Sequence, residues 1–316
     1  MSLSNRVVLL DGGMGQELLK RSQHAPTPLW SASVMLDEAN LVREVHSDYI
    51  RSGARVITLN NYTATPTRLA DQGIGDAFES LHQAAIAAAT ASRSAHVAQN
   101  APGHSVRIAG CLPPLVSSYH AEDVPNEATC ARDYTRLVQA QVAGVDLFLC
   151  ETLTTALEVQ TATAAGVASG KPVWTSMTVS DTDGTLLRSG EPLEIAVQTA
   201  VAAGATAVLI NCSWPEAITQ GLPILAACGL PFGAYANGFT DAAALEAGGT
   251  VEGLRVRTDL GPDAYAVHAM RWVAMGARLV GGCCEVGPAH IQRLSEVLQA
   301  EGFVLTDQPE SIGHRA

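Results

Sequence analysis

The segment AGATAVLINC, residues 203–212, carries the pattern that decides the fold. A glycine follows a helical stretch, and after two more residues comes an apolar run without alternation. Glycine adopts the left-handed conformation that ends a helix at little steric cost. The uninterrupted apolar run is typical of a parallel strand buried on both faces. The same form recurs at residues 52–60 (SGARVITLN), 143–151 (AGVDLFLCE) and 275–284 (MGARLVGGCC), so the repeated unit is helix, tight turn and parallel strand.

Alternating strands and helices of this kind predict an α/β fold, a single-domain (β/α)8 TIM barrel. The 316 residues suffice, since such a barrel commonly needs about 250. A doubly wound open sheet is the alternative, but no GxGxxG follows the first strand. Strands are expected at residues 7–10, 56–60, 107–111, 147–150, 172–179, 207–211, 232–236 and 279–281. Helices are expected between the strands, for example at residues 40–52, 77–98, 126–143, 191–203 and 262–275.

Three further segments complete the predicted organisation. Residues 24–39 are expected to be an inserted loop after the first strand. Residues 1–303 are expected to form the barrel domain, and residues 304–316 a loose C-terminal tail. We find no linker that would divide the chain into two domains.

Composition excludes several classes of partner. The chain has 19 basic and 31 acidic residues, a net charge of -12. Nucleic acids and anionic membranes, in contrast, bind surfaces on which Lys and Arg are clustered. No stretch approaches the roughly 18 apolar residues of a membrane span, and the apolar run before Asp11 is too short for a signal peptide. Seven cysteines are an odd number for a disulfide framework. We therefore expect a cytoplasmic protein with small-molecule substrates, with homo-oligomerisation left open.

Polar residues follow most of the predicted strands, and three of them are cysteines. Cys212 closes the sixth strand, and Cys283 and Cys284 close the eighth. In a barrel, chemistry gathers at the C-terminal ends of the strands, where ends separated by one strand lie about 10 Å apart. Three thiolates suit Zn²⁺, and three protein ligands leave a fourth position for substrate. Gly281 and Gly282 would let two consecutive cysteines face one ion.

Packing and redox chemistry remain alternatives for adjacent cysteines, because free cysteine is among the most buried residue types. On their own, Cys283 and Cys284 are as compatible with those roles as with metal; Cys212 at a matching strand end favours zinc. The other cysteines and several aromatic residues are expected to serve packing alone: Cys111, Cys130, Cys150, Cys228, Trp174, Trp214 and Tyr235.

The sequence resembles the homocysteine S-methyltransferase family along residues 7–298. The pairing of INC with GGCC is the most specific part of the resemblance, whereas DGGMG alone would be weak. The matching motifs are DGGMGQEL (11–18), LWSASVMLDEANLVREVHSDYIRSGARVIT (29–58), NNYTAT (60–65), ET (151–152), DGTLLRSGEPL (183–193), INC (210–212), YAN (235–237) and GGCCEVGPAHI (281–291).

The resemblance implies a zinc enzyme that methylates the thiol of L-homocysteine to give methionine. Cys212, Cys283 and Cys284 match the three zinc ligands of the family, where zinc activates the substrate thiol. Asp11 and Glu151 match acidic residues that hold the homocysteine amino group. From the residues alone, Asp11 before two glycines is equally compatible with a turn.

The resemblance also implies residues around the carboxylate and the methyl donor. Gly12 lies beside the homocysteine carboxylate, and Trp30 and Tyr62 match or lie near aromatic positions on the donor. An aromatic face can hold a sulfonium or quaternary ammonium cation. Thr152 stands where betaine enzymes carry Tyr, which weakens the resemblance to those enzymes. Residues 29–65 look most like the S-methylmethionine branch of the family, so we expect S-methylmethionine as donor, with betaine and methylfolate as alternatives. Selenohomocysteine as acceptor is left open, as is the role of the divergent loop from Cys111 to Tyr119.

Two other functions use the same features. A non-catalytic barrel that senses redox state or holds structural zinc would use the same cysteines with four filled ligand positions or a reversible disulfide. A barrel lyase or aldolase needs a Lys at a strand end or a phosphate-binding glycine loop. Lys20 and Lys171 are the only lysines, and neither closes a predicted strand.

Overall fold

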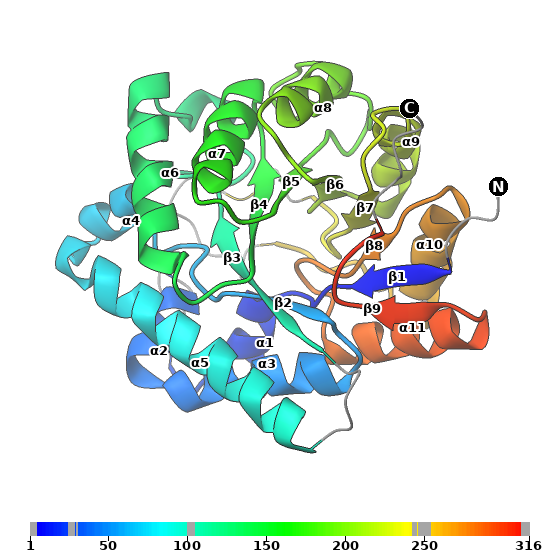
Figure 1. Cartoon of the computed structure of the whole chain (residues 1–316), viewed down its shortest axis with the longest axis horizontal. Coiled ribbons are helices and arrows are strands. Elements are labelled where there is room, and N and C mark those ends of the chain that lie inside the picture. Colours follow the sequence, from blue (N-terminus) through cyan, green and yellow to red (C-terminus); the bar gives the residue numbers. More distant parts are fainter. Residues whose placement is uncertain are drawn as a thin grey trace.

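Parallel strands form a ring at the centre of the molecule, and helices surround it (Figure 1). The computed structural model describes residues 5–24, 29, 31–99, 105–241, 245 and 254–310. The sheet order is β2-β3-β4-β5-β6-β7-β8-β1-β9, with every pairing parallel. The strands are β1 (Arg6–Leu9), β2 (Val56–Thr58), β3 (Arg107–Leu112), β4 (Leu147–Leu153), β5 (Val173–Met177), β6 (Ala207–Asn211), β7 (Phe232–Tyr235), β8 (Leu279–Val280) and β9 (Val304–Thr306).

Strand β1 closes the barrel by contacting two different strands along one edge. Its first residues pair with β9, with Arg6 opposite Val304. Just beyond its end, Leu10 bridges to Val56 at the start of β2, and the Asp11 amide donates to the Val56 carbonyl at 3.1 Å. The predicted (β/α)8 barrel is confirmed, with β9 added at the end of the barrel where β1 begins.

The helices lie outside the ring, and several begin at sequence signals for a helix N-terminus. In α7, Thr155 and Glu158 form a capping box, which satisfies backbone donors that have no partner within the helix. The helices are α1 (Met14–Arg21), α2 (Ser31–Asp37), α3 (Ala39–Arg51), α4 (Pro66–Asp71), α5 (Phe78–Gln99), α6 (Glu127–Gln141), α7 (Ala156–Ala168), α8 (Leu193–Ala202), α9 (Pro215–Ala226), α10 (Pro262–Ala274) and α11 (Pro288–Ala300).

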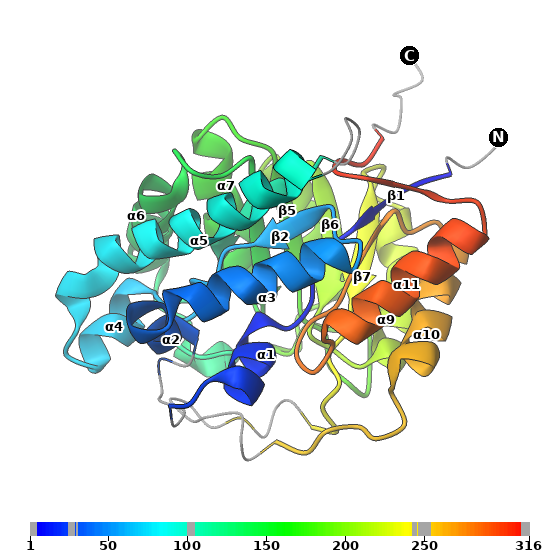
Figure 2. The same ribbon diagram turned by 90° about the horizontal axis from the view of Figure 1, so that it is seen from below.

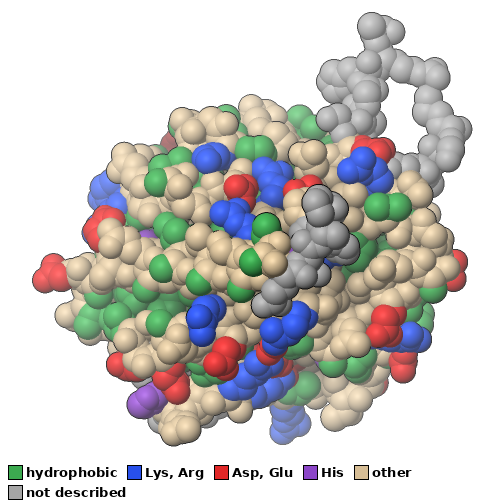
Figure 3. Space-filling view, turned by 60° about the horizontal axis from the view of Figure 1, so that its bottom comes forward, with side chains coloured by type: hydrophobic (Ala, Val, Ile, Leu, Met, Phe, Trp, Pro, Cys, Tyr) green, Lys and Arg blue, Asp and Glu red, His purple; other side chains and the backbone are tan. Residues whose placement is uncertain are grey.

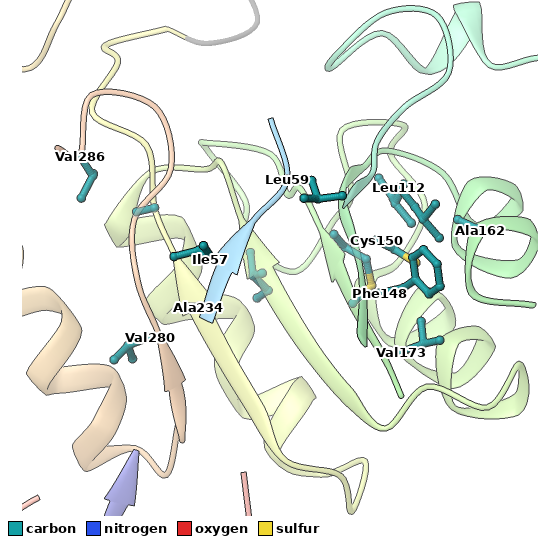
Figure 4. Close-up of a cluster of buried hydrophobic side chains, with 14 of the residues drawn as sticks. Ile57, Leu59, Leu112, Phe148, Cys150, Ala162, Val173, Ala234, Val280 and Val286 are labelled. Atoms are coloured by element: carbon teal, nitrogen blue, oxygen red, sulfur yellow. The ribbon is translucent and has the colours of Figure 1, made fainter. Parts of the chain in front are cut away.

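The strands separate two hydrophobic cores because successive side chains point to opposite faces. In β6, Ala207 and Leu209 pack inside the barrel, whereas Val208 and Ile210 pack outward against the helices. Figure 4 shows part of the outer core, in which strand side chains such as Phe148 lie near Ala162 of α7. The inner core fills the barrel below the strand ends, so the cavity described below has a rigid floor.

Two predictions about connecting segments are wrong. The expected loop at residues 24–39 contains helix α2, which packs against α3 and α5. The expected loose tail from residue 304 begins with strand β9, because an apolar Val304–Thr306 run pairs with the free edge of β1. The predicted helices agree with the observed ones within two residues, and the predicted strands within three.

Three of the four glycines of the repeated unit have the expected left-handed backbone: Gly53, Gly204 and Gly276. Gly144 does not have a positive φ. A Cβ at Gly144 would lie 2.3 Å from Cγ2 of Ile86, so close approach of α5 excludes a side chain there. The predicted turn at Gly144 is therefore present, but glycine is needed there for close packing and not for a left-handed backbone.

The surface in Figure 3 carries Lys and Arg side chains interspersed with Asp and Glu, with no broad area of one sign. The excess of acidic residues is therefore not gathered into one field on this face. Among the described residues, no helix is both long enough and apolar enough to span a bilayer.

Candidate active site

A cavity opens at the C-terminal ends of the strands, with about 870 Å³ of empty space that includes open solvent. The walls come from the segments that follow β1, β2, β3, β6 and β8 and from the ends of β4 and β7. Figure 2 shows α1, which borders this cavity, near one end of the barrel, with β1 starting toward the other end.

The three predicted cysteines converge in this cavity. The sulfur atoms of Cys212, Cys283 and Cys284 all lie within 4.8 Å of one another. The Cys212 sulfur is 2.8 Å from that of Cys283 and 3.8 Å from that of Cys284. The prediction that two separate strand ends bring three sulfurs to one point agrees with this geometry.

The sulfur cluster fits a tetrahedral zinc ion. Zn–S bonds of about 2.3 Å place two thiolates of a tetrahedral site about 3.8 Å apart. The Cys212–Cys284 separation already has this value, and the Cys212–Cys283 separation would have to open by about 1 Å. Sulfur-only ligands favour zinc over harder cations such as magnesium. Among the described residues the group contains three such side chains, which leaves one position for another ligand.

Hydrogen bonding redistributes protons within the cluster. Burial raises the pKa of Cys212, but contacts with Cys283, Cys284 and Tyr119 more than offset it, and the net pKa lies well below the ordinary value. The pKa values of Cys283 and Cys284 are raised, chiefly by their contacts with the Cys212 sulfur. The cluster therefore ionises at one sulfur first. Metal binding to such a site releases the remaining protons.

Local backbone geometry explains how the cysteines reach this position. Cys212 has a φ of 49°, in the left-handed region, which turns the chain sharply at the end of β6. A Cβ on Gly282 would lie 2.1 Å from Cγ1 of Val286, so only glycine allows the turn that carries Cys283 and Cys284. Strained backbone of this kind concentrates at functional sites.

Two carboxylates border the same cavity. Asp11 accepts a 2.8 Å hydrogen bond from the Thr58 amide, but burial outweighs this contact and, with repulsion from Glu151, raises the pKa of Asp11 to about 8. Burial also raises the pKa of Glu151 to about 7. Two buried acids without a counter-charge hold protons that a bound cation would displace.

Asn211 links the acidic group to the sulfur cluster. Its side-chain oxygen accepts hydrogen bonds from the Thr152 amide at 2.9 Å and the Ser176 hydroxyl at 2.8 Å. Its side-chain nitrogen donates to the Thr152 hydroxyl at 2.9 Å. These bonds hold Thr152 in a left-handed conformation, φ 63°, directly after Glu151. Because Asn211 also precedes Cys212, one buried amide fixes both halves of the site.

The N-terminus of α1 faces the cavity beside Asp11. Gly12, Gly13, Met14 and Gly15 line the cavity, and Gly13 offers no side chain to cap the helix. The first backbone N–H groups of a helix lack partners within the helix and attract anions. The predicted place of Gly12 is therefore next to backbone donors suited to a carboxylate.

Of the two predicted aromatic residues, the structure describes Tyr62 and not Trp30. Trp30 lies outside the described residues. Tyr62 lines the cavity, with its hydroxyl 2.8 Å from the Ser118 hydroxyl. The guanidinium of Arg68 lies over the Tyr62 ring, 5.4 Å from its centroid. One face of that ring already contacts a cation, which leaves only the opposite face for a ligand.

Three residues of the site were not predicted. Tyr119 lines the cavity and its hydroxyl lies 3.0 Å from the Cys212 sulfur. Tyr235 was expected to serve packing, but it also lines the cavity, and its hydroxyl donates to Glu151 at 3.5 Å. Cys111 is buried as expected and also donates to Glu151, at 2.9 Å. Cys111 and Tyr235 each lie at the end of a predicted strand, which was a signal in the sequence, whereas Tyr119 lies in a loop.

The ionisable groups that line the cavity are acids, which become anionic when a cation displaces their protons. Asp11, Glu151 and the three cysteines border it, whereas no Lys or Arg occurs among the described residues that line it. Such a cavity favours ligands with positively charged groups.

Known proteins resemble this chain along nearly all of its length. Homocysteine S-methyltransferase of Escherichia coli (strain K12) is 32% identical over 305 residues, covering 91% of this chain and 94% of the relative. Selenocysteine Se-methyltransferase of Brassica oleracea var. italica is 27% identical over 330 residues, covering 97% and 93%. The crystal structure of the metallated form of the E. coli homocysteine methyltransferase MmuM superposes with a TM-score of 0.78 at 30% identity, covering 92% of this chain and 96% of that chain.

The fold and the cysteine cluster define a TIM-barrel enzyme with a thiolate metal site. The chain belongs to the homocysteine S-methyltransferase family, whose profile matches residues 8–298. It is therefore a methyltransferase, and its cofactor is zinc, in agreement with the sulfur-only ligand group and the metallated form of the relative.

Proposed function

We propose that the chain transfers a methyl group from a sulfonium donor, S-methylmethionine, to the thiolate of L-homocysteine. Both products are then methionine. The observation that carries this proposal is one cavity in which three cysteine sulfurs lie near two buried carboxylates, without a basic side chain among its described lining residues. Cys212, Cys283 and Cys284 are the proposed zinc ligands.

The amino-acid end of homocysteine has a suitable partner for each charge. Asp11 and Glu151 would pair with the ammonium group, whose charge relieves the repulsion between two buried acids. The carboxylate would meet the uncapped N-terminus of α1 beside Gly12. With both ends held, the substrate sulfur is directed toward the cysteine cluster.

When bound, zinc supplies one chemical effect, the deprotonation of a thiol that ligates it. The protein itself supplies binding and orientation of the substrates. The cavity holds the substrate sulfur in line with the methyl carbon of the donor, and positioning of this kind lowers the barrier without a covalent enzyme intermediate. As the new C–S bond forms, the sulfonium C–S bond breaks and a neutral thioether leaves. Because opposite charges are neutralised, a weakly solvated cavity favours the step.

The charge of the cavity favours a sulfonium donor. A sulfonium cation suits a cavity lined by carboxylates and thiolates, and an aromatic face contributes about 0.5–2 kcal/mol to holding it. Tyr62 offers the ring face opposite Arg68, and Trp30 remains a proposed donor residue on the strength of the resemblance. Betaine, a zwitterion whose methyl groups are also attached to a cationic centre, is disfavoured by Thr152 at the position where betaine enzymes carry Tyr.

A labelling experiment tests the proposal. Unlabelled S-methylmethionine, betaine and methylfolate are offered in turn to the zinc-loaded enzyme with homocysteine that carries an isotopic label in its carbon skeleton. We expect labelled methionine chiefly from S-methylmethionine. Faster labelling from betaine or methylfolate would overturn the choice of donor, and no labelled methionine from any of the three would overturn the proposal as a whole.

A further inference from the structure

The loop between β3 and α6 brings Tyr119 onto the sulfur cluster. Its hydroxyl oxygen lies 3.0 Å from the Cys212 sulfur. Tyr119 has a φ of 71°, a left-handed conformation that a tyrosine adopts only where its surroundings hold it. Because a cysteine that ligates a metal carries no proton, the phenol must be the donor in this contact.

Arg188 supports both partners of this contact. Its guanidinium lies over the Tyr119 ring, 4.8 Å from the centroid. The same group contacts the Cys212 carbonyl oxygen at 3.4 Å and forms an ion pair with Asp181 at 3.0 Å, with only 6% of the Arg188 side chain exposed. Thr178 accepts from Arg188 at 3.0 Å and donates to the Cys212 carbonyl at 3.2 Å. One buried cation therefore fixes the Tyr119 ring and the Cys212 backbone together.

The proposed reaction creates a problem of selectivity. An electrophilic methyl group enters a cavity lined by three cysteines as well as the substrate thiolate. Attack by a cysteine would form an S–CH3 bond on the enzyme, expel the same neutral thioether and remove a metal ligand. A hydrogen bond to a thiolate engages the electron pair needed for attack and also orients the ligand toward its metal.

We infer that Tyr119 is a positioning residue whose hydroxyl donates a hydrogen bond to the Cys212 thiolate, keeping this sulfur on the metal and unreactive toward the methyl donor. Arg188 holds Tyr119 in place for this role. The inference rests on the proposed function for its biological meaning, but the hydrogen bond has consequences that are measurable without methyl transfer.

The test compares Tyr119→Phe with Tyr62→Phe. Both changes remove one phenol oxygen from the same cavity, but the Tyr62 hydroxyl contacts Ser118 rather than sulfur. Zinc affinity is measured by competition with a chromogenic chelator. Alkylation of Cys212 in the zinc-loaded protein is followed by iodoacetamide treatment and peptide mass spectrometry, and circular dichroism verifies folding.

We expect Tyr119→Phe to weaken zinc binding about 10- to 100-fold, as loss of an outer hydrogen bond to a metal ligand does, and to accelerate alkylation of Cys212. Tyr62→Phe should change neither. Arg188→Lys, which keeps the charge but loses the planar group over the ring, should shift both quantities in the same direction by less.

Two results would overturn the inference. The first is a Tyr119→Phe protein that binds zinc and reacts with iodoacetamide like the parent. The second is a phenolate-to-metal absorption band in the cobalt-substituted parent that Tyr119→Phe lacks, because the oxygen would then ligate the metal instead of the sulfur. If no donor yields methionine while these zinc and alkylation results hold, the proposed function fails and the role of Tyr119 stands.

Discussion

Three hydrogen bonds fix the backbone of Cys212 and thereby position its sulfur. Its amide donates to the Tyr235 carbonyl at 3.0 Å, and its carbonyl accepts from Thr178 and Arg188. With a left-handed φ, the residue cannot relax without breaking these bonds. The sulfur therefore meets Cys283 and Cys284 as part of a preorganised site.

Replacing Cys212 by Ala should abolish zinc binding and methyl transfer, because two remaining thiolates cannot hold the ion in a site that needs three. Zinc per chain, measured by atomic emission, should fall from about one to near zero. Cys228→Ala is the matched control, since Cys228 lies outside the cluster and the cavity lining. A Cys212→Ala protein that retains zinc and turnover would contradict the proposed ligand set.

Asp11 should make the stability of the metal-free, substrate-free protein depend on pH. Its pKa rises from 3.8 to about 8 on folding, so the folded state binds the proton more tightly than the unfolded state. This contribution is fully present below about pH 4 and is lost as the pH rises toward 8. The melting temperature should decline across this window, and Asp11→Asn should flatten the decline. An equal decline in both proteins would exclude Asp11 as its source.

Single residues were predictable where a strand end placed them, and unpredictable where a loop did. Cys212 and Glu151 follow or close apolar runs, so the barrel geometry places them at one rim. Tyr119 contacts the sulfur of Cys212, 93 residues away in the sequence. This contact depends on the left-handed backbone of Tyr119, which hydrophobic periodicity does not predict. The contact between Arg68 and the Tyr62 ring was not predicted either, because it also involves loop residues.

At the scale of elements, the short segment between β8 and α11 determines how two neighbouring cysteines face one point. Gly282 packs against Val286, and Gly281 packs against Leu10, the residue that follows β1. The Cys283 amide donates to the Ala236 carbonyl at 2.9 Å, and the Gly238 amide donates to the Cys284 carbonyl at 2.9 Å. The turn is thus anchored to the segment that follows β7.

Gly282→Ala should disturb this turn, because the new Cβ would meet Val286 at 2.1 Å. Overpacking of this kind costs about 1–3 kcal/mol, and the shift should also weaken zinc binding. Urea unfolding and chelator competition measure the two effects. Gly261→Ala is the control, since no atom lies within 4 Å of its Cβ position. Adding Val286→Ala should relieve part of the defect, and absence of any relief would place its cause elsewhere.

The sequence predicted elements well where hydrophobic periodicity extended over a full helix or strand. It failed for α2, whose seven residues have too few turns to show a period, and for β9, whose three residues are too short to stand out. Both are stabilised by tertiary packing: α2 contacts α3 and α5, and β9 pairs with β1. Short elements of this kind depend on neighbours that the local sequence does not specify.

For the molecule as a whole, β9 covers an edge of β1 at the end of the barrel opposite the cavity. Without β9, the first residues of β1 would have no strand on this edge, because the contacts with β2 begin only at Leu9 and Leu10. Exposed strand edges are also sites of aggregation. The segment therefore matters for closure and solubility, while the chemistry takes place at the other rim.

Truncation after Phe303 should lower the melting temperature, since each kcal/mol of stability that is lost shifts it by about 1.5 °C in a domain of this size. Truncation after Glu310 is the control because it keeps β9 and all of its pairings with β1. Zinc content should be the same in both proteins. An unchanged melting temperature after removal of β9 would show that the strand adds nothing to closure.

The scarcity of positive side chains around the cavity limits which metabolites the enzyme can recruit. The described lining contains no Lys or Arg, and the single helix end beside Gly12 can neutralise one carboxylate but not a string of them. Phosphorylated compounds and folates with polyglutamate tails would lose hydration there without receiving a counter-ion. We therefore expect polyanions to compete poorly for the cavity with small zwitterions that carry an extra positive charge.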